Sequence, residues 1–168
     1  MIVVSPLHVV EELVASYNIG RVLGLLAGCN EHPDLPDLAA SGNHLKLTMH
    51  DIAMPIDGMT TPGASHVETL IDFIADWDRQ TPMLIHCWAG ISRSTASAYI
   101  AQCMLAPEKS EQALAAELRA LSPSATPNPL IIAHADAILG RSGRMITAID
   151  DIGRGANAFE GNVFEWMI

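Results

Sequence analysis

Short apolar runs and longer amphipathic stretches alternate along most of the chain. A few consecutive apolar residues are typical of a buried strand, whereas apolar residues spaced three or four positions apart are typical of a helix with one buried face. On this basis, strands are predicted at residues 2–4, 20–27, 44–49 and 83–85. Helices are predicted at residues 7–17, 65–77, 92–105, 110–121 and 130–139, with helical character resuming after residue 143.

Local signals set the boundaries of several of these elements. Ser65 and Glu68 have the spacing of a capping box, in which two side chains satisfy backbone N–H groups at the start of a helix. Prolines and glycines predict loops at residues 29–42 and 53–63. Residues 156–168 show no apolar period, so we expect a loose C-terminal tail after a single domain formed by residues 1–155.

The order of the predicted elements indicates the fold class. Strands alternate with helices in the first half of the chain, and only helices follow. This order predicts an α/β fold with a central, mostly parallel sheet of about four to five strands flanked by helices. The C-terminal half is expected to be all helical.

Charge and cysteine content narrow the possible partners and compartments. The 168-residue chain has a net charge of −10, which argues against binding to nucleic acid or to an anionic membrane. No apolar stretch is long enough to span a membrane, and the N-terminus lacks the pattern of a signal peptide. Three cysteines cannot all pair with one another, so a reducing cytoplasm is the expected location.

Residues 84–95, between a predicted strand and a predicted helix, carry the candidate chemistry. A loop at this place points backbone N–H groups at one spot, and the helix N-terminus adds a positive dipole. Gly90 would allow a close backbone approach, and Arg93 could grip two oxygens of a phosphate. The loop therefore predicts an anion site even in an acidic protein. Its expected substrate-binding residues are Trp88, Ala89, Gly90, Ile91, Ser92 and Arg93.

The same loop would activate Cys87 as a nucleophile. Backbone N–H groups and a neighbouring arginine stabilise a thiolate, which is the reactive form of cysteine. Ser94 lies where its hydroxyl could hydrogen-bond the Cys87 sulfur when the thiolate becomes a leaving group. The ring of His86 is expected to brace the loop by hydrogen bonds, and Trp88 could either pack under the loop or line the mouth of a pocket. Cys29 and Cys103 are expected to be core thiols.

These residues resemble the signature of the protein tyrosine and dual-specificity phosphatases. The pattern His-Cys-x-x-Gly-x-x-Arg-Ser is matched by His86, Cys87, Gly90, Arg93 and Ser94. Pro127-Asn128, before an apolar helix, also resembles a segment of dual-specificity phosphatases, and the likeness extends roughly over residues 20–139. The resemblance implies a phosphatase fold and a cysteinyl-phosphate intermediate, with Cys87, Arg93, Ser94 and an upstream aspartic acid as catalytic residues.

Two residues compete for the role of that aspartic acid. Asp51 follows the strand predicted at residues 44–49 and begins an Asp-x-x-x-Pro run similar to that of tyrosine-specific phosphatases. Asp57 lies 30 residues before Cys87, a spacing similar to that of compact dual-specificity enzymes. We favour Asp51 because the end of a strand holds a side chain more firmly than the middle of a loop does.

The expected function is therefore hydrolysis of phosphate monoesters in a phosphorylated protein or a small phosphate ester. Phosphotyrosine is the leading substrate, with phosphoserine and phosphothreonine as further ones. A pseudophosphatase that only binds phosphoproteins and an inositol-phosphate phosphatase remain as alternatives. The seven histidines show no spacing typical of metal ligands, so neither a metal nor a cofactor is expected.

Overall fold

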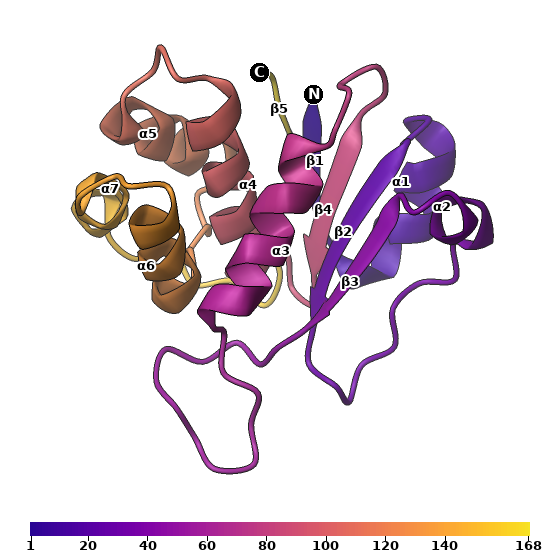
Figure 1. Cartoon of the computed structure of the whole chain (residues 1–168), viewed down its shortest axis with the longest axis horizontal. Coiled ribbons are helices and arrows are strands. Elements are labelled where there is room, and N and C mark those ends of the chain that lie inside the picture. Colours follow the sequence, from indigo (N-terminus) through magenta and orange to yellow (C-terminus); the bar gives the residue numbers. More distant parts are fainter.

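A five-stranded sheet forms the centre of the protein, and the computed structural model describes all residues from 1 to 168 (Figure 1). The strands are β1 (Ile2–Pro6), β2 (Arg21–Leu26), β3 (His44–Thr48), β4 (Met83–Cys87) and β5 (Phe164–Trp166). They lie in the order β3-β2-β4-β1-β5, and all neighbours are parallel except β1 and β5. The carboxyl end of the central strand β4, where Cys87 lies, is therefore flanked by other strand ends.

Helices cover both faces of the sheet. They are η1 (Leu7–Val9), α1 (Val10–Ser16), α2 (Pro36–Ala40), α3 (Ala64–Ala75), α4 (Arg93–Leu105), α5 (Glu111–Leu121), α6 (Pro129–Ile138) and α7 (Arg144–Ile152). The helices α1 and α2 cover one face, and α3 to α7 lie on the other (Figure 1). The larger core lies under α3 to α7. None of the helices has the length and apolar character needed to cross a bilayer.

The predicted fold class is confirmed: the structure is α/β with a mostly parallel sheet flanked by helices. The expectation that the C-terminal half contains only helices is wrong, because β5 pairs with β1 as an antiparallel edge strand. Residues 164–166 alternate between buried Phe164, exposed Glu165 and buried Trp166. A strand of three residues is too short to give a clear alternating pattern in the sequence.

Two local predictions also need correction. The helix α3 begins at Ala64 rather than after Ser65, and the ring Nδ1 of His66 accepts the backbone N–H of Gly63 at 3.2 Å. The predicted Ser65–Glu68 capping box is therefore not formed. Within the predicted loop at residues 29–42, Pro36 starts the short helix α2, a position that suits proline because its missing N–H would be unpaired there.

The helix α4 connects this architecture to the candidate site. It runs through the interior, with the residues from Arg93 to Cys103 buried. Small residues make up much of its first two turns, which lets the helix pack closely against the sheet. Because β4 ends at Cys87 and α4 begins at Arg93, the residues predicted to bind phosphate form the connection between the central strand and the central helix.

Candidate active site

The loop at residues 88–92 presents its backbone N–H groups without hydrogen-bond partners in the protein. Its carbonyl groups, in contrast, are held from outside the loop. The carbonyl of Trp88 accepts from Leu7 (3.1 Å), that of Ala89 from Gly161 (2.8 Å) and that of Ile91 from Thr126 (2.9 Å). Buried or partly buried N–H groups rarely remain unpaired in proteins unless they bind a ligand or solvent. Unpaired N–H groups at the N-terminus of a helix such as α4 can bind an anion.

Gly90 is required for the course of this loop. Its φ is +69°, in the left-handed region that favours glycine. A Cβ added there would also lie 2.7 Å from the backbone nitrogen of Pro6 and 2.8 Å from the carbonyl carbon of Ser5. Both obstacles involve backbone atoms at the end of β1, which cannot move aside as a flexible side chain could.

We therefore predict that Gly90→Ala destabilises the protein by about 3 kcal/mol, combining left-handed strain with the clash against β1. Urea unfolding measures the change. Gly140→Ala is the matched control, because Gly140 has a similar φ of +63° but open space around its Cβ position. Gly140→Ala should lower the free energy of unfolding only by the left-handed strain, about 1–2 kcal/mol. Equal effects of the two substitutions would show that the close approach of Gly90 to β1 costs nothing.

Cys87 lies at the floor of a cavity of about 460 Å³. Its side chain is almost fully buried, and its Sγ lies 3.2 Å from the hydroxyl of Ser94 on the first turn of α4. The cavity is lined by Asn30, Asp51, Cys87, Trp88, Ala89, Ile91, Ser92 and Arg93. The predicted residues of the loop are thus gathered around the sulfur, although Gly90 turns away to meet β1 and does not line the cavity.

The guanidinium of Arg93 is held beside the same cavity. Its Nη1 donates to the backbone carbonyl of Met49 at 2.8 Å, just after β3, and the residue is only 5% exposed. Its Nε has no hydrogen-bond partner in the protein and lies 4.0 Å from Oδ2 of Asp51, at the outer limit of an ion pair. One edge of the guanidinium is thus anchored, while Nε remains available for an anion.

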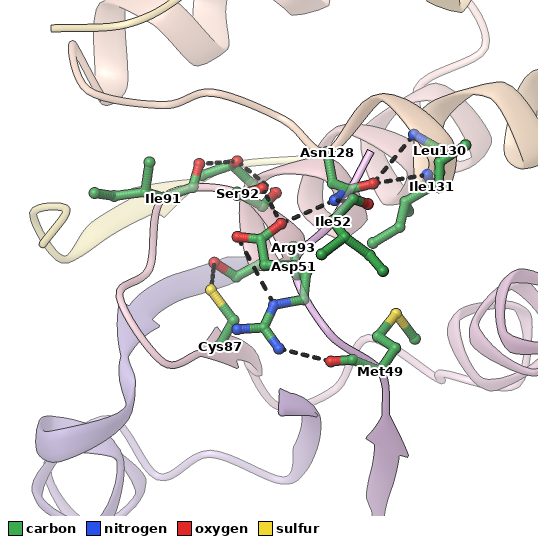
Figure 2. Close-up of polar contacts among 12 residues, drawn as sticks. Met49, Asp51, Ile52, Cys87, Ile91, Ser92, Arg93, Asn128, Leu130 and Ile131 are labelled. Carbon is green, nitrogen blue, oxygen red and sulfur yellow. Dashed lines mark hydrogen bonds and ion pairs between the residues drawn. The ribbon is translucent and has the colours of Figure 1, made fainter. Parts of the chain in front are cut away.

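Asp51 is fixed over the loop by two side chains (Figure 2). Its Oδ1 accepts from the hydroxyl of Ser92 at 2.7 Å and from Nδ2 of Asn128 at 2.8 Å. Asn128 is nearly buried at the start of α6, where its own Oδ1 accepts the backbone N–H groups of Leu130 and Ile131. The carboxyl group of Asp51 is therefore held by two helix starts and faces Arg93 and Cys87.

The alternative acid, Asp57, lies elsewhere on the same loop. The backbone N–H of His50 donates to the carbonyl of Thr60 at 2.8 Å, and the N–H of Thr60 donates back to Nδ1 of His50 at 2.9 Å. These two bonds close the neck of the loop beside Asp51. Asp57 lies in the exposed part beyond the neck, makes no hydrogen bond or ion pair and does not line the cavity. The structure thus brings Asp51, and not Asp57, to the cavity that contains Cys87.

The C-terminal segment also contributes to the site. The N–H of Gly161 donates to the carbonyl of Ala89, and the exposed ring of Phe159 meets that of Trp88 edge-on with centroids 5.5 Å apart. Trp88 is 45% exposed and lines the mouth of the cavity, which decides between its two predicted placements. The segment expected to be a loose tail is therefore tied to the loop that surrounds Cys87.

The ring of His86 does not brace the loop as expected. Burial lowers the pKa of His86 to about 3, so the ring is neutral, and neither ring nitrogen has a hydrogen-bond partner. The backbone of Cys87 acts in the opposite direction and raises the pKa of His86, but its contact with the ring does not have the geometry of a hydrogen bond. The expectation that Cys29 is a core thiol is also wrong, because Cys29 is exposed.

Several residues of the site could not be assigned from the sequence. The sequence marks Asn128 only as part of Pro127-Asn128 and gives no sign that it holds Asp51. No sequence pattern points to three further groups, which are Asn30, the carbonyl of Met49 and Phe159. Asn30 lies in a loop, Met49 contributes only a backbone atom, and Phe159 lies in a segment without an apolar period. Only the folded structure brings these groups close to the residues of the motif.

Solved structures with the same fold come from dual-specificity and protein tyrosine phosphatases. The crystal structure of DUSP15 superposes with a TM-score of 0.63 at 18% identity, covering 89% of this chain and 90% of that chain. The PTP-2 phosphatase of Cydia pomonella gives 0.58 at 18% identity, covering 81% of this chain and 84% of that chain. PTPMT1 gives 0.57 at 14% identity, covering 85% of this chain and 94% of that chain. No curated protein matches the sequence.

Fold and sequence motif together define a phosphatase of the protein tyrosine and dual-specificity superfamily. Within it, the chain belongs to the family described as DSP-PTPase phosphatase fused to NAD+ kinase, which matches residues 34–128, more than half of its length. The matched segment begins before Asp51 and ends at Asn128, and it includes the whole loop around Cys87.

Proposed function

We propose that the protein hydrolyses phosphate monoesters through a cysteinyl-phosphate formed on Cys87. The observation that carries this proposal is the set of unpaired backbone N–H groups at residues 88–92, in a loop that lines one cavity together with Cys87 and Arg93, whose Nε is also unpaired. This arrangement can bind the three non-bridging oxygens of a phosphate and place its phosphorus in front of the sulfur. The intact set of reactive groups argues against a protein that only binds phosphate.

The reaction follows from these positions in two steps. The Cys87 thiolate attacks phosphorus, while Asp51 donates a proton to the departing oxygen. Water then attacks the cysteinyl-phosphate, Asp51 accepts a proton, and the hydroxyl of Ser94 at 3.2 Å stabilises the sulfur as its negative charge returns. Arg93 and the backbone N–H groups hold the non-bridging oxygens, where charge is concentrated in the transition state. The mechanism requires no metal ion.

The rim of the cavity favours an aryl phosphate such as phosphotyrosine. Trp88 and Phe159 form an exposed aromatic pair beside the mouth, which suits contact with a phenyl ring. A competing substrate class, inositol phosphates, is favoured by Arg154, which lines a neighbouring hollow of about 380 Å³ together with Asp51 and Ser92. That cation could bind a second phosphate. PTPMT1, one of the proteins with this fold, has been crystallised with PI(5)P.

Direct assays test both the activity and the substrate class. The protein should hydrolyse p-nitrophenyl phosphate and should be inhibited competitively by vanadate. Phosphotyrosyl peptides should be better substrates, by kcat/KM, than phosphothreonyl peptides or inositol phosphates. An inositol phosphate that exceeds all peptides would transfer the assignment to the second class. Absence of turnover on every ester, with phosphate still bound, would identify a pseudophosphatase.

We predict that Asp51→Ala lowers kcat on a phosphotyrosyl peptide by on the order of 10²–10⁴-fold, because the departing oxygen loses its proton donor. The loss should shrink for an aryl ester whose phenoxide leaves without protonation, and the basic limb of the pH–rate profile should flatten. Asp51→Asn can still accept the hydrogen bonds of Ser92 and Asn128, so it should show the same pattern with the loop undisturbed.

The matched control is Asp57→Ala, which removes a carboxylate from the same loop beyond its neck. Its kcat should change little on either substrate. If the loss of kcat that shrinks with a better leaving group appears instead in Asp57→Ala, the acid is Asp57. If neither variant shows this pattern of loss, the proton comes from a group outside this loop.

A further inference from the structure

Three histidines that are distant in the sequence meet on the face of the sheet that α1 and α2 cover. His86 precedes Cys87 on β4, His44 begins β3, and His32 comes from the loop between β2 and α2. One ring nitrogen from each lies within 4.8 Å of the others. The ring of His32 lies between its two neighbours, with centroids 6.2 Å from His44 and 6.1 Å from His86.

The backbone of β2 makes room for this His32–His44–His86 cluster at Gly24. Gly24 pairs with His86 across the sheet, so both positions face the same side. A Cβ at Gly24 would lie 2.6 Å from Nδ1 of His32 and 2.6 Å from Nε2 of His86. Any other residue would push the two rings apart, so this glycine allows the nitrogens to converge above the central strands.

The protein itself does not satisfy these nitrogens. Both ring nitrogens of His32, His44 and His86 are buried and lack a hydrogen-bond partner. The hydroxyl of Ser5, the register partner of His86 on β1, is likewise buried and unpaired. So many unpaired polar atoms at one place are costly unless a bound species supplies their partners.

We infer that the His32–His44–His86 cluster binds one Zn²⁺ ion, with solvent as the fourth ligand. Three imidazoles and an open position form a known type of zinc coordination. In a tetrahedral site with Zn–N distances of about 2.0–2.1 Å, ligand nitrogens lie about 3.3 Å apart. The rings must therefore close by roughly 1.5 Å, which small side-chain rotations can supply. The charge of nearby Lys46 opposes a cation, but its side chain is exposed and screened by solvent.

An ion at this position would also hold in place a loop that lines the catalytic cavity. His32 and Asn30 lie on the same loop, and Asn30 lines the cavity that contains Cys87. An ion shared by His32, His44 and His86 would fasten that loop to the strand that ends at Cys87. The site is separate from the proposed chemistry: it lies on the opposite face of the sheet from the larger core and does not depend on phosphatase activity.

The test measures metal binding directly in a Cys29→Ser/Cys87→Ser background, which removes the exposed and the catalytic thiols as competing ligands. After treatment with a chelator, this protein should bind one Co²⁺ per chain, with visible bands of four-coordinate cobalt and no thiolate charge-transfer band. Zn²⁺ should displace Co²⁺ and raise the melting temperature. His32→Ala and His44→Ala should each weaken Zn²⁺ binding on the order of 100-fold or more.

His134→Ala is the matched control, because His134 lies on α6, away from the cluster. It should keep the cobalt spectrum and the zinc-dependent rise in melting temperature. Absence of cobalt bands in the background protein would overturn the proposal without any histidine variant. Binding that His32→Ala and His44→Ala leave unchanged, or that His134→Ala abolishes, would also overturn it. Circular dichroism of the metal-free variants separates loss of ligands from loss of fold.

Discussion

Replacing Cys87 with serine is expected to lower kcat on the order of 10⁴-fold or more while the protein remains folded. A serine hydroxyl is a much weaker nucleophile than a cysteine sulfur, so the proposed attack on phosphorus is lost. The side chain is buried beside the hydroxyl of Ser94 and differs from serine by a single atom, so the packing changes little. Steady-state hydrolysis of p-nitrophenyl phosphate measures the loss, and vanadate binding by calorimetry checks that the anion site persists.

The other two cysteines provide controls for this result. Cys29 is exposed, and Cys29→Ser should keep full activity. Burial raises the pKa of Cys103 to about 12, so this thiol stays protonated and unreactive on α4. Alkylation of the native protein should therefore abolish activity through Cys87 alone. Turnover by Cys87→Ser above a few per cent of the native rate would show that another group attacks phosphorus.

Replacing Arg93 with lysine is expected to lower kcat/KM on the order of 10³-fold, although the positive charge is kept. The guanidinium reaches the carbonyl of Met49 with Nη1 and leaves Nε for the substrate. An ammonium group is a point charge without this planar fork, so it cannot make both contacts at once. The same assay measures the loss, and weaker competitive inhibition by vanadate should accompany it.

Arg79→Lys is the matched control for charge-conserving replacement. Arg79 is exposed in the turn between α3 and β4, at the opposite end of β4 from Cys87. Its replacement should leave kcat/KM unchanged within error. Near-native activity of Arg93→Lys would show that positive charge alone suffices and that the anchored fork has no role in catalysis.

Much of the fold could be predicted from the sequence because its strongest patterns are local. Consecutive apolar residues marked β2 and β4, and the spacing of apolar residues marked the amphipathic helices α1 and α3. The edge strand β5 was missed because only three of its residues pair, and the pairing is with β1 at the other end of the chain. Likewise, the Gly63–His66 contact at the start of α3 depends on side-chain orientation, which composition does not reveal.

The residues around Cys87 could be predicted because the loop between β4 and α4 is continuous in the sequence. The chemistry proposed for it depends on a nucleophile, a glycine and an arginine at fixed short spacings, and these are visible without a structure. The sequence also favours Asp51 over Asp57 for the proposed role of acid, but it gives only part of the reason. Tertiary structure supplies the rest, through the closed neck at His50 and Thr60 and the contacts of Ser92 and Asn128.

What only the tertiary structure decided are the contacts between distant segments. Asn128 meets Asp51 across 77 positions, and Gly161 reaches the loop at Ala89. The histidines give the clearest case, because residues 32, 44 and 86 show no metal-ligand spacing along the chain. Parallel pairing of β3, β2 and β4 brings two of them to one face, and the loop after β2 places the third above Gly24. Sequence patterns report local periodicity, whereas such clusters arise from strand order and register.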